Sequence, residues 1–406
     1  MICYFKAISI ILDSVNFYLY DKKISVKIEK SLNMISSCNI YSNTNIPKFN
    51  NSAMDGFAFK HSGLIDFIKK KYSIIGTLKA GENVNIFYKN KNSVVEIMTG
   101  ANIPREFDTV IKIEDTDYKK NNNVTFRKLV KKGANVRISG EDYKTDDILV
   151  KKGEVINTSH VMSLSAFGIS SINVIKKTKI YIICTGKEIS DDNNSIDDNS
   201  INNVNGPYLK CILKNLGFSV SYLGIIKDCE EKFLNLIKSI INNDELILII
   251  STGAVSRGKA DFIPEALSKL KVNILFHRVN IKPGKPLLYA KMNSNIYFFS
   301  LPGNIISTVI GFRFFLYPFL RHINGMSFEN PIKARLLNIS YFSKKDVFLK
   351  AFFYFKNACL YVNILEEQES FKISGLLESN CFVFLYSSII YKKNDLVNIY
   401  SYEVLF

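Results

Sequence analysis

The sequence LILIISTGAVSRGKADF occupies residues 246–262 and joins an apolar run to a loop that contains two glycines. A continuous apolar run of this length is typical of a strand buried on both faces of a parallel sheet. A helix is expected from about Pro264. Backbone N–H groups of the loop and the start of that helix favour an anion. For this segment alone, an ordinary β–α turn remains the alternative.

Two other segments repeat the pattern of a strand followed by a glycine loop. Residues 179–184 read KIYIIC before Thr185-Gly186, and residues 296–300 read IYFFS before the loop LPGN at 301–304. Strands that alternate with helices indicate a parallel sheet covered on both faces. Because ligands sit beyond the carboxyl ends of such strands, the three loops should meet at one edge.

Charged residues surround these loops. The segment IKPGKP at 281–286 holds Lys282 and Lys285 on a backbone stiffened by prolines, which suits an oxyanion. Glu188, Asp228 and Asp261 are expected near the same edge, where a divalent cation would bridge them to phosphate oxygens. The alternatives are a solvated turn for the lysines and ordinary surface positions for the carboxylates.

The flanking regions predict further parts. Residues 1–25 resemble an amphipathic helix, and residues 26–144 a mostly β module with marked segments at 51–59, 96–104 and 135–147. Turn chemistry is the alternative for each marked segment. Residues 145–177 contain a helix from Ser159 to Gly168, and residues 327–406 form a small all-β domain without visible chemistry. The Asp-, Asn- and Ser-rich stretch 190–203 predicts a mobile loop.

The helix in residues 1–25 is predicted from spacing. Phe5, Ile8, Leu12 and Val15 recur at helical intervals and should form its buried face.

Composition limits the class of protein. The chain has 406 residues, of which 47% are hydrophobic and 22% charged, so several folded domains are expected and extensive disorder is excluded. The net charge of +16 invites a nucleic-acid interpretation, but the lysines are spread along a chain rich in Lys, Asn and Ile. We therefore expect no nucleic-acid partner.

The sequence also predicts where in the cell the protein is located. The most apolar window, residues 296–320, is interrupted by Pro302, Gly303, Asn304 and Arg313, so it predicts a strand, a loop and a helix instead of a membrane span. The 7 cysteines include no C-x-x-C pair. Without a recognisable signal peptide, we expect a cytoplasmic protein with no membrane association.

Taken in order, seven segments resemble the molybdopterin molybdenumtransferase family, whose eukaryotic relatives include the E-domain of gephyrin. They read NSAMDGFAF (51–59), EIMTGANIP (96–104), NVRISGEDYKTDD (135–147), CTGKEI (184–189), STGAVSRGKADF (251–262), IKPGKP (281–286) and SLPGNIIS (300–307). Each segment alone is a weak signal, but their common order across residues 1–326 is specific.

The resemblance implies a multidomain α/β protein. Its parts would be a helical linker part (1–25 with 145–177), a mostly β module (26–144), a three-layer molybdopterin-binding domain with a parallel or mixed sheet (178–326) and a β-barrel-like domain (327–406). It also implies a homodimer with the active site between subunits, and a molybdopterin adenylyltransferase as a possible partner.

The implied reaction consumes adenylated molybdopterin and molybdate with Mg²⁺, releases AMP, and leaves molybdenum on the dithiolene. The implied catalytic residues are Asp55, Thr99, Arg137, Asp142, Glu188, Asp228, Lys282 and Lys285. The implied ligand-binding residues are Thr185, Gly186, Thr252, Gly253, Ser256, Gly258, Arg278, Pro302, Gly303 and Asn304. The implied metal ligands are Glu188, Asp228 and Asp261.

The chain departs from the family pattern at four positions. Ala254 replaces a glycine, Ile305 a proline, Lys187 an aspartate and Arg278 a lysine. Three other functions remain open. They are an adenylyltransferase acting one step earlier, a non-catalytic or decayed scaffold of the same fold, and a basic nucleic-acid binder.

Overall fold

The computed structural model describes residues 1–15, 23–61, 70–83, 92–119, 122–176, 178–192, 199–241, 246–256, 261–338 and 341–403. These residues form two compact units. Unit 1 contains residues 1–38, 152–161 and 171–406, and unit 2 contains residues 39–151 and 162–170. Within the described residues, no helix is long and apolar enough to cross a membrane.

Unit 1 contains the sheet predicted from the three strand–loop repeats. Its order is β16-β13-β17-β21-β20-β18, and the first four strands are parallel. The last two, β20 and β18, add antiparallel pairs, so the sheet is mixed. The strands are β13 (Lys179–Thr185), β16 (Ser219–Ile226), β17 (Ile247–Thr252), β18 (Asn273–His277), β20 (Leu288–Lys291) and β21 (Ile296–Leu301).

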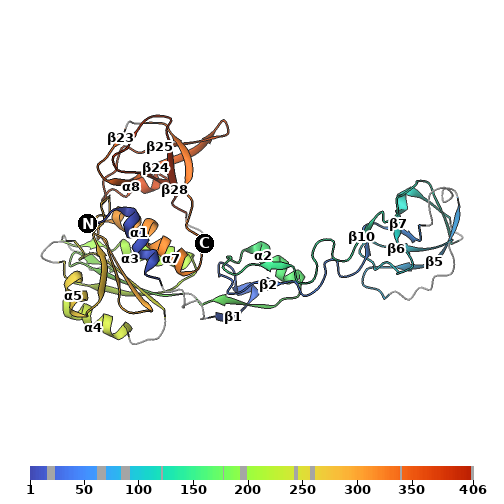
Figure 1. Cartoon of the computed structure of the whole chain (residues 1–406), viewed down its shortest axis with the longest axis horizontal. Helices are drawn as coiled ribbons and strands as arrows, with labels where there is room; N and C mark the ends of the chain where they lie inside the picture. The colour runs from blue at the N-terminus through green and yellow to red at the C-terminus, as the bar shows by residue number, and fades with distance from the viewer. Residues whose placement is uncertain are drawn as a thin grey trace. The chain divides into compact units, whose positions relative to one another are not determined.

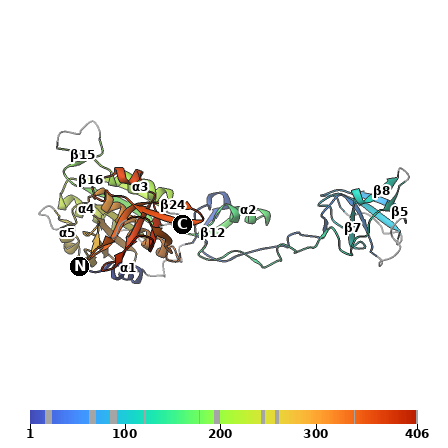
Figure 2. The same cartoon turned by 90° about the horizontal axis from the view of Figure 1, so that it is seen from above.

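Helices cover both faces of this sheet, which confirms the three-layer prediction (Figure 1). Alternate residues of each strand point to opposite faces, so Leu248 and Ile249 belong to different cores. One face packs against α4 (Glu230–Ile241) and α5 (Ile263–Lys269). The other packs against α1 (Tyr4–Asp13), α3 (Asn205–Asn215), α6 (Ile305–Gly311) and α7 (Tyr317–Ile323). Helix α3 runs beside β16 in Figure 2.

Helix α1 differs from its prediction in length and in buried face. Its buried residues are Tyr4, Ala7, Ile8 and Ile11, whereas Phe5 is 54% exposed. The Tyr4 ring reaches into an aromatic group that a local periodicity could not reveal, because its members lie more than 300 residues later in the chain. Helix α1 therefore packs beside α7 and the C-terminal domain.

The C-terminal domain is a closed barrel, as predicted. Strands β24, β25, β22, β28 and β26 pair in that order, and β24 also pairs with β26. Their bounds are β22 (Ile332–Leu336), β24 (Asp346–Lys356), β25 (Cys359–Ile364), β26 (Cys381–Leu385) and β28 (Leu396–Ser401). The short β19 (Ile281–Lys282) joins β24 in parallel. Smaller elements are β23 (Tyr341–Phe342), β27 (Ile390–Tyr391), α8 (Ser374–Leu377) and a π-helical turn, η5 (Phe312–Leu316).

Unit 2 is mostly β, as predicted for this region. A six-stranded sheet has the order β7-β4-β6-β5-β9-β8, with apolar clusters on its two faces. Its strands are β4 (Gly56–Phe59), β5 (Lys71–Leu78), β6 (Ser93–Ile97), β7 (Thr109–Lys112), β8 (Thr116–Lys119) and β9 (Asn123–Phe126). Two small pairs add β2 (Ile40–Tyr41) with β11 (Ile148–Val150), and β3 (Asn51–Ser52) with β10 (Val136–Arg137).

The helix predicted from Ser159 to Gly168 is present as α2 (Thr158–Ala166), but residues 145–177 also contain strands. Helix α2 lies between β11 and β12 (Ser171–Ile175), and β12 pairs with β1 (Lys23–Lys27). The alternation of Ile172 and Val174 with polar residues suits a half-buried strand, which explains the difference. The described residues also form 3₁₀ turns at Ile28–Lys30 and Ile113–Asp115.

Candidate functional site

The three glycine loops of unit 1 meet in one cavity of about 680 Å³. Strands β13, β17 and β21 are parallel neighbours, so their carboxyl ends and loops lie at the same edge. Eleven of the predicted site residues line this cavity. They are Thr185, Gly186, Glu188, Asp228, Thr252, Gly253, Ser256, Asp261, Pro302, Gly303 and Asn304. Gly258 lies outside the described residues.

Direct contacts join each of these loops to its neighbour. The Thr185 hydroxyl donates to the carbonyl oxygen of Thr252 at 3.0 Å, and Gly253 N–H donates to the carbonyl of Leu301 at 3.0 Å. Gly253 has a φ of +86°, and a Cβ there would lie 2.4 Å from the carbonyl oxygen of Thr185. Only glycine fits this close approach.

Ala254 follows Gly253 and also has a positive φ, of +49°. The chain therefore keeps the left-handed conformation at a position where the resemblance leads us to expect glycine. An L-residue pays a steric cost in this conformation.

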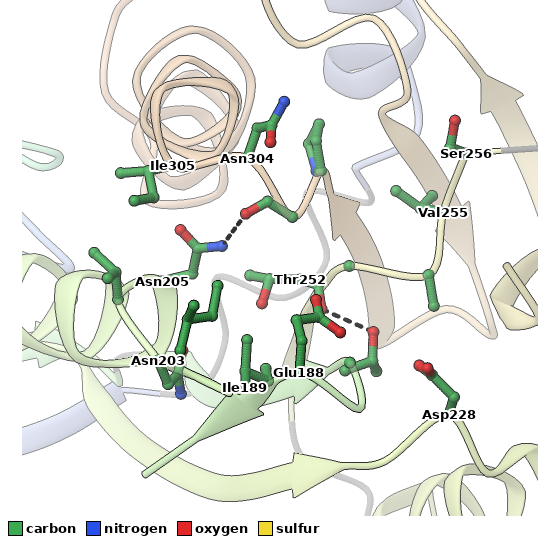
Figure 3. Close-up of a pocket in the computed structure, with 18 of the residues that line it drawn as sticks. Glu188, Ile189, Asn203, Asn205, Asp228, Thr252, Val255, Ser256, Asn304 and Ile305 are labelled. Atoms are coloured by element: carbon green, nitrogen blue, oxygen red, sulfur yellow. Dashed lines mark hydrogen bonds between the residues drawn. The ribbon is translucent and has the colours of Figure 1, made fainter. Parts of the chain in front are cut away.

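Carboxylates occupy the other side of the cavity (Figure 3). The Glu188 carboxylate folds back over Gly186, where an added Cβ would lie 2.7 Å from it. Burial raises the pKa of Asp228, and the negative charges of Glu188 and Asp261 raise it further. The Lys187 N–H and its side-chain charge oppose this rise.

These three carboxylates suit a hard divalent cation in chemistry, because their repulsion would fall when one is bound. Among the described residues, however, no three acidic, cysteine or histidine side chains are gathered closely enough to hold a metal by themselves. Mg²⁺ is commonly held by one or two carboxylates together with substrate phosphates, so the residues present fit that mode.

The predicted lysines lie in a second cavity of about 700 Å³. Lys282 and Lys285 line it together with Lys345, Gln368 and Ser370 of the C-terminal domain. The two cavities share Pro286. The C-terminal domain, in which the sequence revealed no chemistry, thus contributes one wall.

Arg278 lines neither of these two cavities. It has a φ of +76°, and its backbone N–H donates to the carbonyl of Leu287 at 2.8 Å. Its predicted role in binding the ligand stays a prediction.

The remaining predicted residues belong to unit 2. Thr99 donates two hydrogen bonds to the Asp55 carboxylate, from its backbone N–H and its hydroxyl, both at 2.7 Å. The backbone bond, followed by the side-chain bond, lowers the pKa of Asp55. Arg137 lies on β10 opposite Asn51, and the N–H of Asp142 donates to the carbonyl of Ile46. The sequence segments 51–59 and 96–104 are therefore in direct contact at Asp55 and Thr99.

Sequence reasoning missed two asparagines of the first cavity, Asn203 and Asn205. Both are 9% exposed, and Asn205 donates to the carbonyl of Gly303 at 2.7 Å. The sequence predicts a mobile loop at 190–203, and the centre of this stretch is not tested. At its two ends, β14 (Ile189–Ser190) pairs with β15 (Ile201–Asn202) along the cavity wall. Residues 193–198 are outside the described part.

Comparisons with known proteins agree with this architecture. The model of the MoeA N-terminal region (domain I and II) matches residues 2–168, and a probable molybdopterin binding domain matches residues 181–322. A molybdopterin biosynthesis MoeA protein from Pyrococcus horikoshii superposes with a TM-score of 0.84 at 25% identity, covering 100% of both chains.

Curated relatives carry one name. The molybdopterin molybdenumtransferase of Staphylococcus aureus strain COL is 33% identical over 319 residues, which cover 77% of this chain and 75% of that protein. The enzyme of the same name from Staphylococcus epidermidis strain RP62A is 31% identical over 321 residues, covering 78% and 75%. These matches show that this chain belongs to the molybdopterin molybdenumtransferase family.

Proposed function

We propose that this chain transfers molybdenum to molybdopterin, using adenylated molybdopterin and molybdate as substrates and releasing AMP. The observation that carries the proposal is the meeting of three glycine loops and three carboxylates in one cavity, beside a second cavity lined by lysines. The loops would bind the phosphates through backbone N–H groups. The dithiolene sulfurs belong to the substrate, so no cysteine cluster is required.

The two cavities suggest separate roles. Lys282 and Lys285 would attract molybdate, since fixed cations bind a compact oxyanion well. Glu188, Asp228 and Asp261 would hold Mg²⁺ with the pyrophosphate oxygens and would orient the attacking water. Mg²⁺ would neutralise charge on the phosphates as the phosphoanhydride bond breaks.

We further propose a homodimer in which Asp55, Thr99, Arg137 and Asp142 complete the cavity of a second subunit. Subunit complementation tests this arrangement. Asp55→Asn and Asp228→Asn should each abolish turnover, and mixing the two inactive variants should restore part of it. If the mixture stays inactive although mixed dimers form, the shared site is wrong. A molybdopterin adenylyltransferase that supplies the substrate is the expected functional neighbour.

The test of the function itself is AMP release from adenylated molybdopterin, measured with and without molybdate and Mg²⁺. Release that requires both and is lost in Asp261→Ala supports the proposal. Binding of the adenylated pterin without any release would instead indicate a scaffold. If the chain does not bind the adenylated pterin, the proposal fails.

A further inference from the structure

The third glycine loop is held differently from the other two. Thr185 and Gly253 make their contacts at the ends of sheet strands, where strand pairing already fixes the backbone. The loop of Pro302, Gly303 and Asn304 lies beyond the end of β21. Backbone bonds fix its two ends, since Gly253 N–H donates to the Leu301 carbonyl and Thr308 N–H to the Asn304 carbonyl. Between these ends the loop is held by side chains.

Three side-chain hydrogen bonds hold this loop. Asn205, at the start of α3, donates from Nδ2 to the Gly303 carbonyl oxygen at 2.7 Å (Figure 3). The Thr308 hydroxyl of α6 donates to the Pro302 carbonyl oxygen at 2.6 Å, and Asn304 of the loop donates from Nδ2 to the hydroxyl of Ser370 in the C-terminal domain at 3.1 Å. Of the three, the bond from Asn205 is the one that reaches Gly303, and Asn205 is only 9% exposed.

Neighbouring side chains hold the backbone at the start of α3, where Asn205 stands. The Asn203 side-chain oxygen accepts from Gly206 N–H at 3.2 Å, at the first turn of α3. The Asn203 amide donates to Asp191 and to the Tyr222 hydroxyl, both at 2.8 Å. Asn205 therefore reaches Gly303 from a fixed helix start, and their hydrogen bond is present without a ligand.

We infer that Asn205 is a positioning residue for the anionic part of the substrate. A backbone carbonyl oxygen is a partial negative charge, and an unpaired one beside a phosphate would repel it. By donating to the Gly303 carbonyl oxygen, Asn205 reduces this repulsion. The same hydrogen bond holds the loop in the conformation that accepts a phosphate. The inference rests on the proposed function, since it takes the cavity to bind a phosphate-bearing ligand.

Two substitutions separate positioning from general stability. Asn205→Asp keeps the size of the side chain but replaces the donating amide with a carboxylate. Asn205→Ala removes the side chain. Asn215→Ala, at the exposed far end of the same helix, is the matched control. Steady-state AMP release gives KM and kcat, and hydrogen exchange of a peptide covering residues 301–308 reports on the loop without any substrate.

We expect Asn205→Asp to raise KM for adenylated molybdopterin by about tenfold or more, as losing one buried donor implies. The kcat should stay within about threefold, because Asn205 does not touch reacting atoms. Both Asn205 variants should speed exchange in the 301–308 peptide, and the control should change neither readout.

Unchanged exchange in both variants would overturn the positioning role. Faster exchange with an unchanged KM in an active enzyme would overturn its link to the ligand, as would a fall in kcat alone. If the wild-type chain releases no AMP, the proposed function fails, while the exchange measurement still decides whether Asn205 holds the loop.

Discussion

The close approach of two loops at Gly253 predicts a specific cost for one added methyl group. Gly253→Ala would place a Cβ 2.4 Å from the backbone carbonyl oxygen of Thr185 and 2.8 Å from its hydroxyl oxygen. Neither loop can yield easily, because the Thr185 hydroxyl and the Gly253 N–H both make cross-loop hydrogen bonds. Gly224 offers a matched comparison in the same sheet, since its φ is +90° and an added Cβ would meet nothing within 4 Å.

The two variants share one cost and differ in another. A left-handed conformation costs an L-residue about 1–2 kcal/mol, and the stiffer unfolded chain returns about 0.5 kcal/mol. Gly224→Ala should therefore lower the free energy of unfolding by about 1 kcal/mol. Gly253→Ala adds the steric clash, and overpacking of this kind costs about 1–3 kcal/mol more. The total for Gly253→Ala is about 2–4 kcal/mol.

Calorimetric unfolding of the full chain and binding of adenylated molybdopterin measure the two effects. We expect Gly253→Ala to unfold at a lower temperature than Gly224→Ala and to lose ligand affinity, whereas Gly224→Ala should bind normally. If both variants unfold at the same temperature and bind equally well, the close approach of Gly253 to Thr185 constrains neither the stability of the fold nor ligand binding.

Three other predictions follow from charge and burial. Thr99→Val removes the hydroxyl bond to Asp55 but keeps the N–H bond, so an NMR titration should show the pKa of Asp55 rising toward its ordinary value; no change would contradict the role of the hydroxyl. Asp55 stabilises the fold above the ordinary carboxyl pKa, and this contribution is lost as pH falls through its lowered value. For Asp228 the sign is opposite, because burial raises its pKa and the metal-free fold loses stability as pH rises through that range. Titration calorimetry should accordingly show Mg²⁺ binding tightening with rising pH across that range, and a pH-independent affinity would argue against Asp228 as a ligand. Glu329→Gln leaves the buried Arg313 without the carboxylate that it contacts at 2.7 Å, so thermal unfolding should reveal a loss of about 3 kcal/mol, and an unchanged midpoint would contradict this.

The parts of the site that follow strands were predictable from sequence. Thr185, Thr252 and Gly303 stand directly after apolar runs, and the geometry of a parallel sheet requires such positions to meet. The mixed character of the sheet was harder to predict. Strands β18 and β20 pair antiparallel, but their direction does not follow from burial, because residues near Leu288 and Ala290 are as buried as those of the parallel strands.

Asn205 shows why other parts could not be predicted. Its partner Gly303 lies 98 residues later, and no local pattern links the two positions. The course of the chain at Arg278 was equally hard to predict. It depends on a backbone turn with a positive φ, which neither the charge of Arg278 nor its place near the IKPGKP segment reveals. Long-range pairing and turn geometry are therefore the two kinds of information that this sequence did not reveal.

The C-terminal barrel illustrates how packing creates a site without a motif. Phe348 and Phe384 of the barrel share one core with Tyr4 of α1 and with the helices that cover the mixed sheet. This shared core brings β24 beside Lys282. The same contact surface lines the second cavity and places Ser370 beside Asn304. The barrel therefore contributes to the wall of that cavity through its position, although its own residues carry no recognisable chemical pattern.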